Sequence, residues 1–195
     1  FHLKPILMNT PDLLMQSIDL DIPLVGLYDA PYSKDFDPII TPKEGKRACA
    51  YQFFNQWRNG KTLLLTKANY GCGGCGHWFF GVENRTRQDY IDFLANDEGL
   101  KASEEIMGLW FDNAKIYEPE NENIFIGPLK NEMYDYLRTI TFFVNPDQLS
   151  VMALAANYYA KPSDPNPVIA QFGSGCMEML NIIEKFFSKK KKKTG

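Results

Sequence analysis

The chain has 195 residues, of which 45% are hydrophobic and 23% are charged, and this composition is typical of a globular protein. No apolar run reaches the roughly 18 residues that a transmembrane helix requires, so we expect a soluble protein with no membrane partner. The formal net charge of −3 includes five lysines, Lys189–Lys193, so the rest of the chain carries −8. An acidic body argues against a nucleic-acid-binding surface.

Short apolar runs alternate with amphipathic segments along the chain. Aliphatic and β-branched runs bounded by turn residues predict strands at residues 21–31, 62–66, 124–129, 139–144 and 168–172. Helical spacing of apolar residues predicts helices at 47–60, 87–100, 102–110, 145–160 and 176–187. In the helix at 145–160, Asn145 suits the N-cap and Gln148 suits the third helical position of a capping box. Alternation of strands and helices predicts an α/β or α+β fold with a mixed sheet and flanking helices.

A chain of this length fits one domain that is large enough to bury a core. We expect this single domain to span residues 1–188 and to be followed by a basic tail at residues 189–195. The chain begins with Phe1, and we expect that either end has been trimmed or altered. No secretory signal pattern stands at the start, so we expect a cytoplasmic location.

The four cysteines occupy similar predicted positions. Cys49 begins a helix, Cys72 and Cys75 lie in a glycine-rich loop after a strand, and Cys176 follows a Gly-Ser-Gly turn at the start of a helix. Backbone N–H groups are free at such positions, and they lower the pKa of a thiol and bind anionic sulfur. We therefore expect thiolates that act together as metal ligands.

Thiolates in this pattern suit an iron–sulfur cluster, with a 4Fe–4S cluster favoured, or a zinc ion. Structural zinc usually takes two short cysteine pairs, whereas this chain has one pair and two distant cysteines, so a cluster is the main hypothesis. We expect Gly73, Gly74 and Gly76 to let the backbone approach the cluster and donate hydrogen bonds to its sulfides.

Other interpretations of these residues stay open. The cysteines can be packed thiols in a small-molecule-binding domain, since free cysteine often behaves as a small apolar residue. A thioredoxin-like pair is disfavoured because the Cys-x-x-Cys motif is not expected at a helix start. His77 is a candidate ligand or proton donor, or the base of a thiol nucleophile, whereas Trp78 is expected in the core.

Several short motifs occur in a fixed order: Arg-x-Cys-Ala at 47–50, Cys-x-Gly at 72–74, Asn-Pro-x-Gln at 145–148 and Ser-x-Cys at 174–176. In this order they resemble the ArCR family of bacteria and archaea, a domain of unknown function (number 169), over residues 20–180. The resemblance implies no known activity. It implies that Cys49, Cys72 and Cys176 match the family pattern and that Cys75 is an addition.

The number of thiolate ligands bears on function. Four would close the coordination of a metal or cluster, whereas three would leave one position open for a substrate. We expect an iron–sulfur protein with a redox or electron-transfer role, acting with a redox partner protein or a small-molecule substrate. The alternatives are a structural zinc or metal-sensing module and a small-molecule-binding domain.

Overall fold

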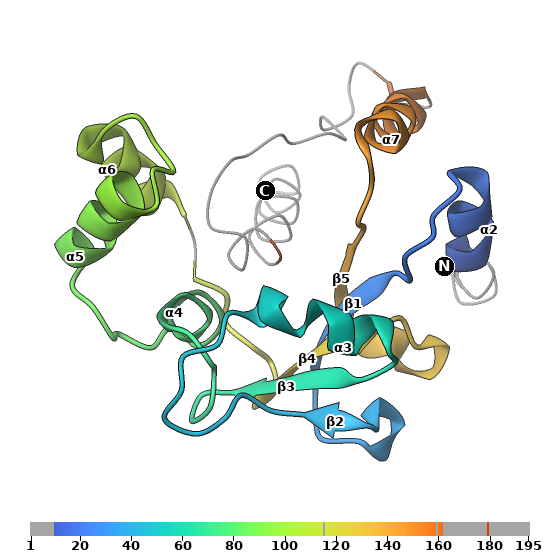
Figure 1. The fold of residues 1–195 in the computed structure, drawn as a ribbon, viewed down its shortest axis with the longest axis horizontal. Helices are drawn as coiled ribbons and strands as arrows, with labels where there is room; N and C mark the ends of the chain where they lie inside the picture. Colours follow the sequence, from blue (N-terminus) through green and yellow to red (C-terminus); the bar gives the residue numbers. More distant parts are fainter. Residues whose placement is uncertain (1–9, 115, 159, 162–178, 180–195) are drawn as a thin grey trace, which may run out of the picture.

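Figure 1 shows a computed structural model of the chain, in which residues 10–114, 116–158, 160–161 and 179 are described. The described part forms a five-stranded mixed sheet with the order β2-β3-β4-β1-β5. Strands β2 and β3 are parallel, and the other neighbours are antiparallel. The strands are β1 (Val25–Ala30), β2 (Ile39–Ile40), β3 (Thr62–Thr66), β4 (Asn123–Pro128) and β5 (Leu137–Thr141). A mixed sheet with flanking helices confirms the predicted α/β class.

Helices surround this sheet. They are α2 (Thr10–Ser17), α3 (Phe54–Arg58), α4 (Gly73–Phe80), α5 (Arg87–Asp92), α6 (Glu104–Asn113) and α7 (Pro146–Tyr158). In Figure 1, the α5 and α6 pair lies to one side of the sheet, and α2 and α7 lie to the other. Short 3₁₀ segments are η1 (Lys34–Phe36), η2 (Ala50–Phe53) and η4 (Asn131–Tyr136), and a π-helical turn, η3 (Phe93–Asp97), continues α5. No helix in the described ranges is long and apolar enough to span a membrane.

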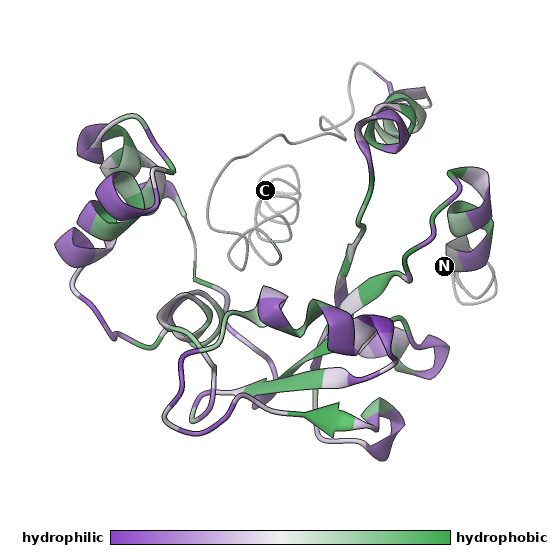
Figure 2. Ribbon diagram, in the orientation of Figure 1, coloured by the Kyte–Doolittle hydropathy of each residue, from purple (hydrophilic) through white to green (hydrophobic). Residues whose placement is uncertain are grey.

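Alternate residues of β4 enter two different cores, as the period of a strand requires. Ile124 and Ile126 belong to the core that α3 and α4 cover, together with Leu27, Leu63, Trp57, Trp78 and Phe79. Phe125 enters the opposite core, where its ring stacks on Phe36 with centroids 4.0 Å apart. Both faces of the sheet are therefore buried, and the strands appear mainly hydrophobic in Figure 2.

The predicted strands at 21–31, 62–66, 124–129 and 139–144 correspond to β1, β3, β4 and β5. The strand predicted at 168–172 lies outside the described residues. The two-residue β2 was not predicted, because Ile39 and Ile40 form too short a run to show a period.

The capping box predicted at the start of α7 is confirmed. The backbone N–H of Gln148 donates to Asn145 Oδ1 and the backbone N–H of Asn145 donates to Gln148 Oε1, each at 2.9 Å. The Gln148 amide also donates to the carbonyl of Ile18 at 2.9 Å, which ties the start of α7 to the segment after α2. The helix predicted at 176–187 lies, apart from Met179, outside the described residues.

The prediction that Cys72 and Cys75 lie in a loop is wrong. Residues Gly73–Phe80 form helix α4, with Cys72 as its N-cap and Gly81 in the left-handed conformation at its C-terminal end. Glycine disfavours helix by about 1 kcal/mol relative to alanine, but this preference yields to tertiary packing. At Gly76 a Cβ atom would lie 2.6 Å from the ring of Tyr70, so the glycine lets that ring pack directly on the helix backbone.

A buried carboxylate anchors the segment before β4. Asp29 in β1 has no exposed surface, and its Oδ2 accepts hydrogen bonds from the Tyr117 hydroxyl and the Glu120 backbone N–H, both at 2.7 Å. Its Oδ1 accepts the Asn121 backbone N–H at 2.9 Å, and the Arg138 guanidinium lies 3.9 Å away. These bonds satisfy a charge that would otherwise be costly to bury.

Candidate functional site

Two of the predicted ligand cysteines line one pocket, which we call the cysteine pocket. Cys49 is the N-cap of η2 and Cys72 is the N-cap of α4, so each thiol stands at the start of a helical segment. The cavity has a volume of about 370 Å³. Its wall consists of Arg47, Cys49, Tyr51, Cys72, Gly73, Gly74, Trp78, Arg85, Tyr90, Phe93, Leu94, Glu98 and Leu100.

A backbone contact brings the two cysteine segments together. The N–H of Ala48, next to Cys49, donates to the carbonyl of Gly71, next to Cys72, at 3.2 Å. Gly71 has a φ of +76°, and a Cβ atom there would lie 2.6 Å from the Ala48 carbonyl oxygen. Only glycine combines this left-handed backbone with so close an approach. Gly71 therefore permits the alignment of both thiols on one wall.

Burial dominates the electrostatics of Cys49. It raises the pKa of the Cys49 thiol, and the nearby Cys72 sulfur raises it further by like-charge repulsion. Backbone hydrogen bonds from Tyr51 and Gln52 act in the opposite direction without reversing the shift.

Cys72 and Cys75 have different surroundings although they share one Cys-x-x-Cys motif. The Cys75 backbone N–H donates to Cys72 Sγ at 3.5 Å, as an N-cap requires. The Cys75 side chain itself has no exposed surface, packs in the core on the α3 and α4 side of the sheet, and is not part of the pocket wall.

The predicted ligand set of four cysteines stays a prediction. Cys176 lies outside the described residues. Among the residues that the structure does describe, no three histidine, cysteine or acidic side chains are grouped closely enough to hold a metal ion. Cys49, Cys72 and Cys75 therefore do not form a metal site by themselves.

Gly73, Gly74 and Gly76 were expected to let the backbone approach a cluster. Gly73 and Gly74 line the cysteine pocket, whereas Gly76 faces Tyr70. The carbonyl of Gly73 accepts a hydrogen bond from the Asn84 side-chain amide at 3.0 Å, and Asn84 Oδ1 in turn accepts the Tyr90 hydroxyl at 2.5 Å. This chain of bonds connects the start of α4 to α5.

His77 lies in α4 but is not part of the wall of the cysteine pocket. Its ring is 8% exposed and packs among Trp78, Tyr90 and Phe111, with centroids 4.5 to 5.6 Å away. This burial lowers its pKa, so the imidazole is neutral at pH 7. Its ring contacts Trp78 and Tyr90, which line the pocket, but the imidazole itself is not part of the wall.

Sequence reasoning missed the charged and aromatic part of the wall. Arg85 follows α4, Tyr90 comes from α5, and Phe93 comes from the π-helical turn that continues α5. These residues belong to no motif with the cysteines, and only tertiary packing brings them together. Trp78 is 3% exposed and belongs to the core, as predicted, but it also lines the pocket.

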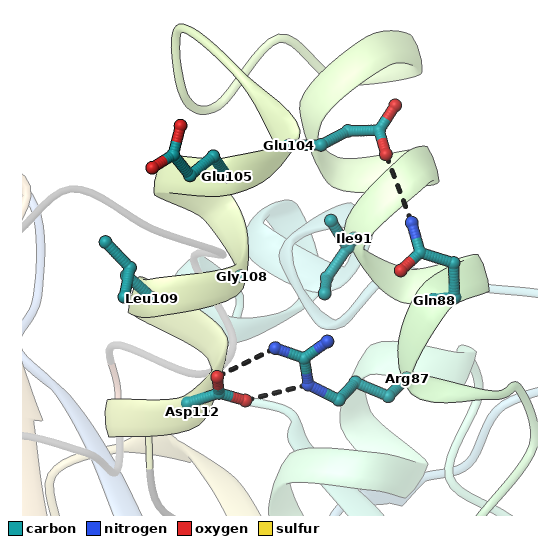
Figure 3. A pocket seen from close by; sticks show the side chains of 8 residues that line it. All are labelled: Arg87, Gln88, Ile91, Glu104, Glu105, Gly108, Leu109 and Asp112. Atoms are coloured by element: carbon teal, nitrogen blue, oxygen red, sulfur yellow. Dashed lines mark hydrogen bonds and ion pairs between the residues drawn. The ribbon is translucent and has the colours of Figure 1, made fainter.

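A second pocket, of about 310 Å³, lies between α5 and α6 (Figure 3). Four of its five polar side chains pair with one another: Arg87 makes two hydrogen bonds of 2.7 Å to Asp112, and Gln88 donates to Glu104 at 3.1 Å. These contacts join the two helices across the groove and occupy the groups that a ligand would use. The cysteine pocket is therefore the better candidate site.

Comparison with known proteins identifies a family but no function. No curated protein and no solved structure matches the chain. A family model described as uncharacterised ArCR, a domain of unknown function, matches residues 14–185, which include every helix and strand from β1 to α7 and all four cysteines. The chain therefore belongs to the uncharacterised ArCR family.

Proposed function

We propose that this chain binds an iron–sulfur cluster in the cysteine pocket through Cys49, Cys72 and Cys176. One observation carries this proposal: Cys49 and Cys72 are distant in sequence, yet they line the same pocket from two helix starts. Cys176 enters from the sequence alone, as the third cysteine that matches the family pattern. Cys75 is left out because its side chain is packed in the core.

The electrostatics of the two thiols favour a cation between them. Burial and the neighbouring Cys72 both raise the pKa of Cys49, so two free thiolates are unfavourable at this site. A bound iron ion reverses this balance, because its positive charge stabilises both thiolates as they lose their protons. The pair is therefore better suited to metal ligation than to nucleophilic catalysis.

A backbone N–H group at one of the two sulfur atoms supports the same interpretation. Cys72 Sγ accepts the N–H of Cys75 at 3.5 Å, and Cys49 stands at the start of η2, where backbone N–H groups lower the pKa of its thiol. Hydrogen bonds to the sulfurs of a cluster site orient the ligands and tune the reduction potential. Gly73 and Gly74 leave the adjoining wall free of side chains, which suits a group bulkier than one ion.

Three cysteine ligands leave one iron of a 4Fe–4S cluster without a protein ligand. When bound, such a cluster supplies one-electron transfer, and its open iron supplies a Lewis-acid position. We infer a redox or electron-transfer role in a reducing cytoplasm, where thiols are kept reduced, with a redox partner protein or a small-molecule substrate.

The test is metal and sulfide analysis of protein purified without oxygen. We expect iron, acid-labile sulfide and a broad visible absorbance in the wild type. The variants Cys49→Ser, Cys72→Ser and Cys176→Ser should lose all three signals. Cys75→Ser is the matched control, because it changes a thiol of the same motif outside the pocket wall, and it should keep them.

The outcomes separate the alternatives. If the wild type contains zinc but no sulfide, the site binds zinc and not a cluster. The zinc content of the same serine variants would then show which cysteines bind it. Neither metal nor sulfide in the wild type would refute cluster binding. A cluster that is lost in Cys75→Ser, in a protein that remains folded, would restore the four-cysteine ligand set.

A further inference from the structure

Two guanidinium groups line the cysteine pocket. Arg47 lies before η2 and Arg85 lies before α5, and both side chains line the cavity. No ion pair among the described residues involves either of them, whereas Arg87 and Arg138 are each paired with a carboxylate. The lining has two cations against one carboxylate, that of Glu98, and this excess of positive charge attracts anions.

The orientation of Arg85 is fixed by aromatic rings. Its guanidinium carbon lies 4.4 Å from the centroid of the Phe93 ring and 5.9 Å from that of Tyr90. These cation–π contacts hold the side chain against the pocket wall. No hydrogen bond among the described residues uses the N–H groups of Arg85, so its guanidinium can bind a carboxylate or phosphate in a bidentate manner.

The remaining wall is largely apolar and flat. Trp78 and Tyr90 are 3% and 4% exposed, so their rings are held in place by the core. Glu98 is the one acidic side chain among the lining residues, against two arginines. A cavity of about 370 Å³ falls within the range typical of small-ligand sites, which combine apolar walls with a few fixed polar groups.

We propose that the cysteine pocket binds a small organic anion, whose carboxylate or phosphate is held by Arg47 and Arg85 and whose planar body lies against the aromatic wall. Such a ligand would lie beside Cys49 and Cys72, where the proposed cluster would present its open iron. Anion binding uses the same pocket as the proposed function but does not require the cluster, because the arginines and rings belong to the protein itself.

Isothermal titration calorimetry with simple probes tests this inference on the full chain. Benzoate and phenyl phosphate supply an anionic group on a ring, and benzamide is the uncharged counterpart of benzoate. We expect saturable binding of at least one anion at millimolar concentration, and binding of benzamide at least about tenfold weaker than that of benzoate, because the neutral amide loses the charge assistance of both arginine contacts.

Variants identify the residues responsible. Arg85→Gln and Arg47→Gln should each weaken binding of the anion about tenfold and leave binding of benzamide unchanged. Arg58→Gln is the matched control, since Arg58 also stacks on a ring, that of Phe54, but lies outside the pocket wall. Arg47 is exposed, so its replacement should leave the fold intact. The Arg47 variant therefore tests anion binding even if the Arg85 variant is unstable.

Several results would overturn the inference: no saturable binding of either anion, equal binding of benzoate and benzamide, or equal effects of Arg58→Gln and the two pocket variants. The double variant Cys49→Ser/Cys72→Ser separates the inference from cluster binding. Retained anion binding in this variant supports a site made by the arginines. Loss of anion binding there, in a protein that remains folded, would refute independence from the cysteines.

Discussion

Replacement of the buried Asp29 by asparagine tests how strongly one carboxylate supports the fold. Its two oxygens accept the Tyr117 hydroxyl and the backbone N–H groups of Glu120 and Asn121. Asparagine has nearly the same shape, but one of its terminal atoms carries N–H donors. Whichever way the amide turns, it faces one backbone N–H with another donor. That N–H loses its acceptor inside the protein.

The cost follows from these contacts. A buried N–H without an acceptor costs about 1–3 kcal/mol, and the loss of charge from the other hydrogen bonds adds roughly 1 kcal/mol. Arg138, 3.9 Å from the carboxylate, also loses a negative neighbour. We therefore expect Asp29→Asn to lower the free energy of unfolding by about 2–4 kcal/mol, which is a large share of the stability of a typical domain.

Urea denaturation followed by tryptophan fluorescence measures this change. Asp112→Asn is the matched control, because Asp112 accepts two hydrogen bonds of 2.7 Å from Arg87 on an exposed surface. Exposed pairs contribute little, so the control should change the midpoint only slightly. Equal effects of the two substitutions would refute the reasoning that burial makes the Asp29 contacts valuable.

Three further predictions concern single residues. Burial lowers the pKa of His77 in the folded protein, so the unfolded chain binds more protons, and the free energy of unfolding should fall as the pH drops through the ordinary histidine pKa of about 6.5. His77→Gln should weaken this dependence of the unfolding free energy on pH, as urea denaturation at a series of pH values can measure. An unchanged dependence would show that other groups cause it. Gly71→Ala should destabilise the protein more than Gly45→Ala, because both glycines have positive φ but only Gly71 would place a Cβ against backbone. Equal midpoints for the two variants would contradict this clash. In metal-free protein the raised pKa of Cys49 should make its alkylation by iodoacetamide slower than that of a free cysteine at neutral pH, as peptide mass spectrometry can measure. A faster reaction would show that the thiol is a thiolate.

Four of the five strands were predictable because short runs rich in apolar and β-branched residues stand between turn residues. The segment Thr62–Thr66 was predicted with the bounds that β3 has, since a short apolar run stands between two β-branched threonines and a glycine precedes it. Local signals of the same kind predicted α7, whose capping box lies within four consecutive residues. An element whose determinants are neighbouring residues can therefore be predicted from the sequence alone.

The cysteine segment shows where local signals fail. Its glycines favour a loop by intrinsic preference, but the segment is helical because Tyr70 packs on the backbone at Gly76 and Cys72 caps the first turn. The different surroundings of Cys72 and Cys75 depend on which side of that helix faces the core. Arg85 joins the pocket only through the fold, so no spacing in the sequence indicates its role.

The hydrogen bond between Ala48 and Gly71 has a consequence for how the pocket would acquire a ligand. In small zinc domains the metal itself assembles the chain, and its removal unfolds the protein. Here a backbone hydrogen bond joins the two cysteine segments, and no metal takes part in that contact. If the pocket takes the proposed cluster, ligation would not be needed to assemble these two segments, and removal of the cluster should leave them together.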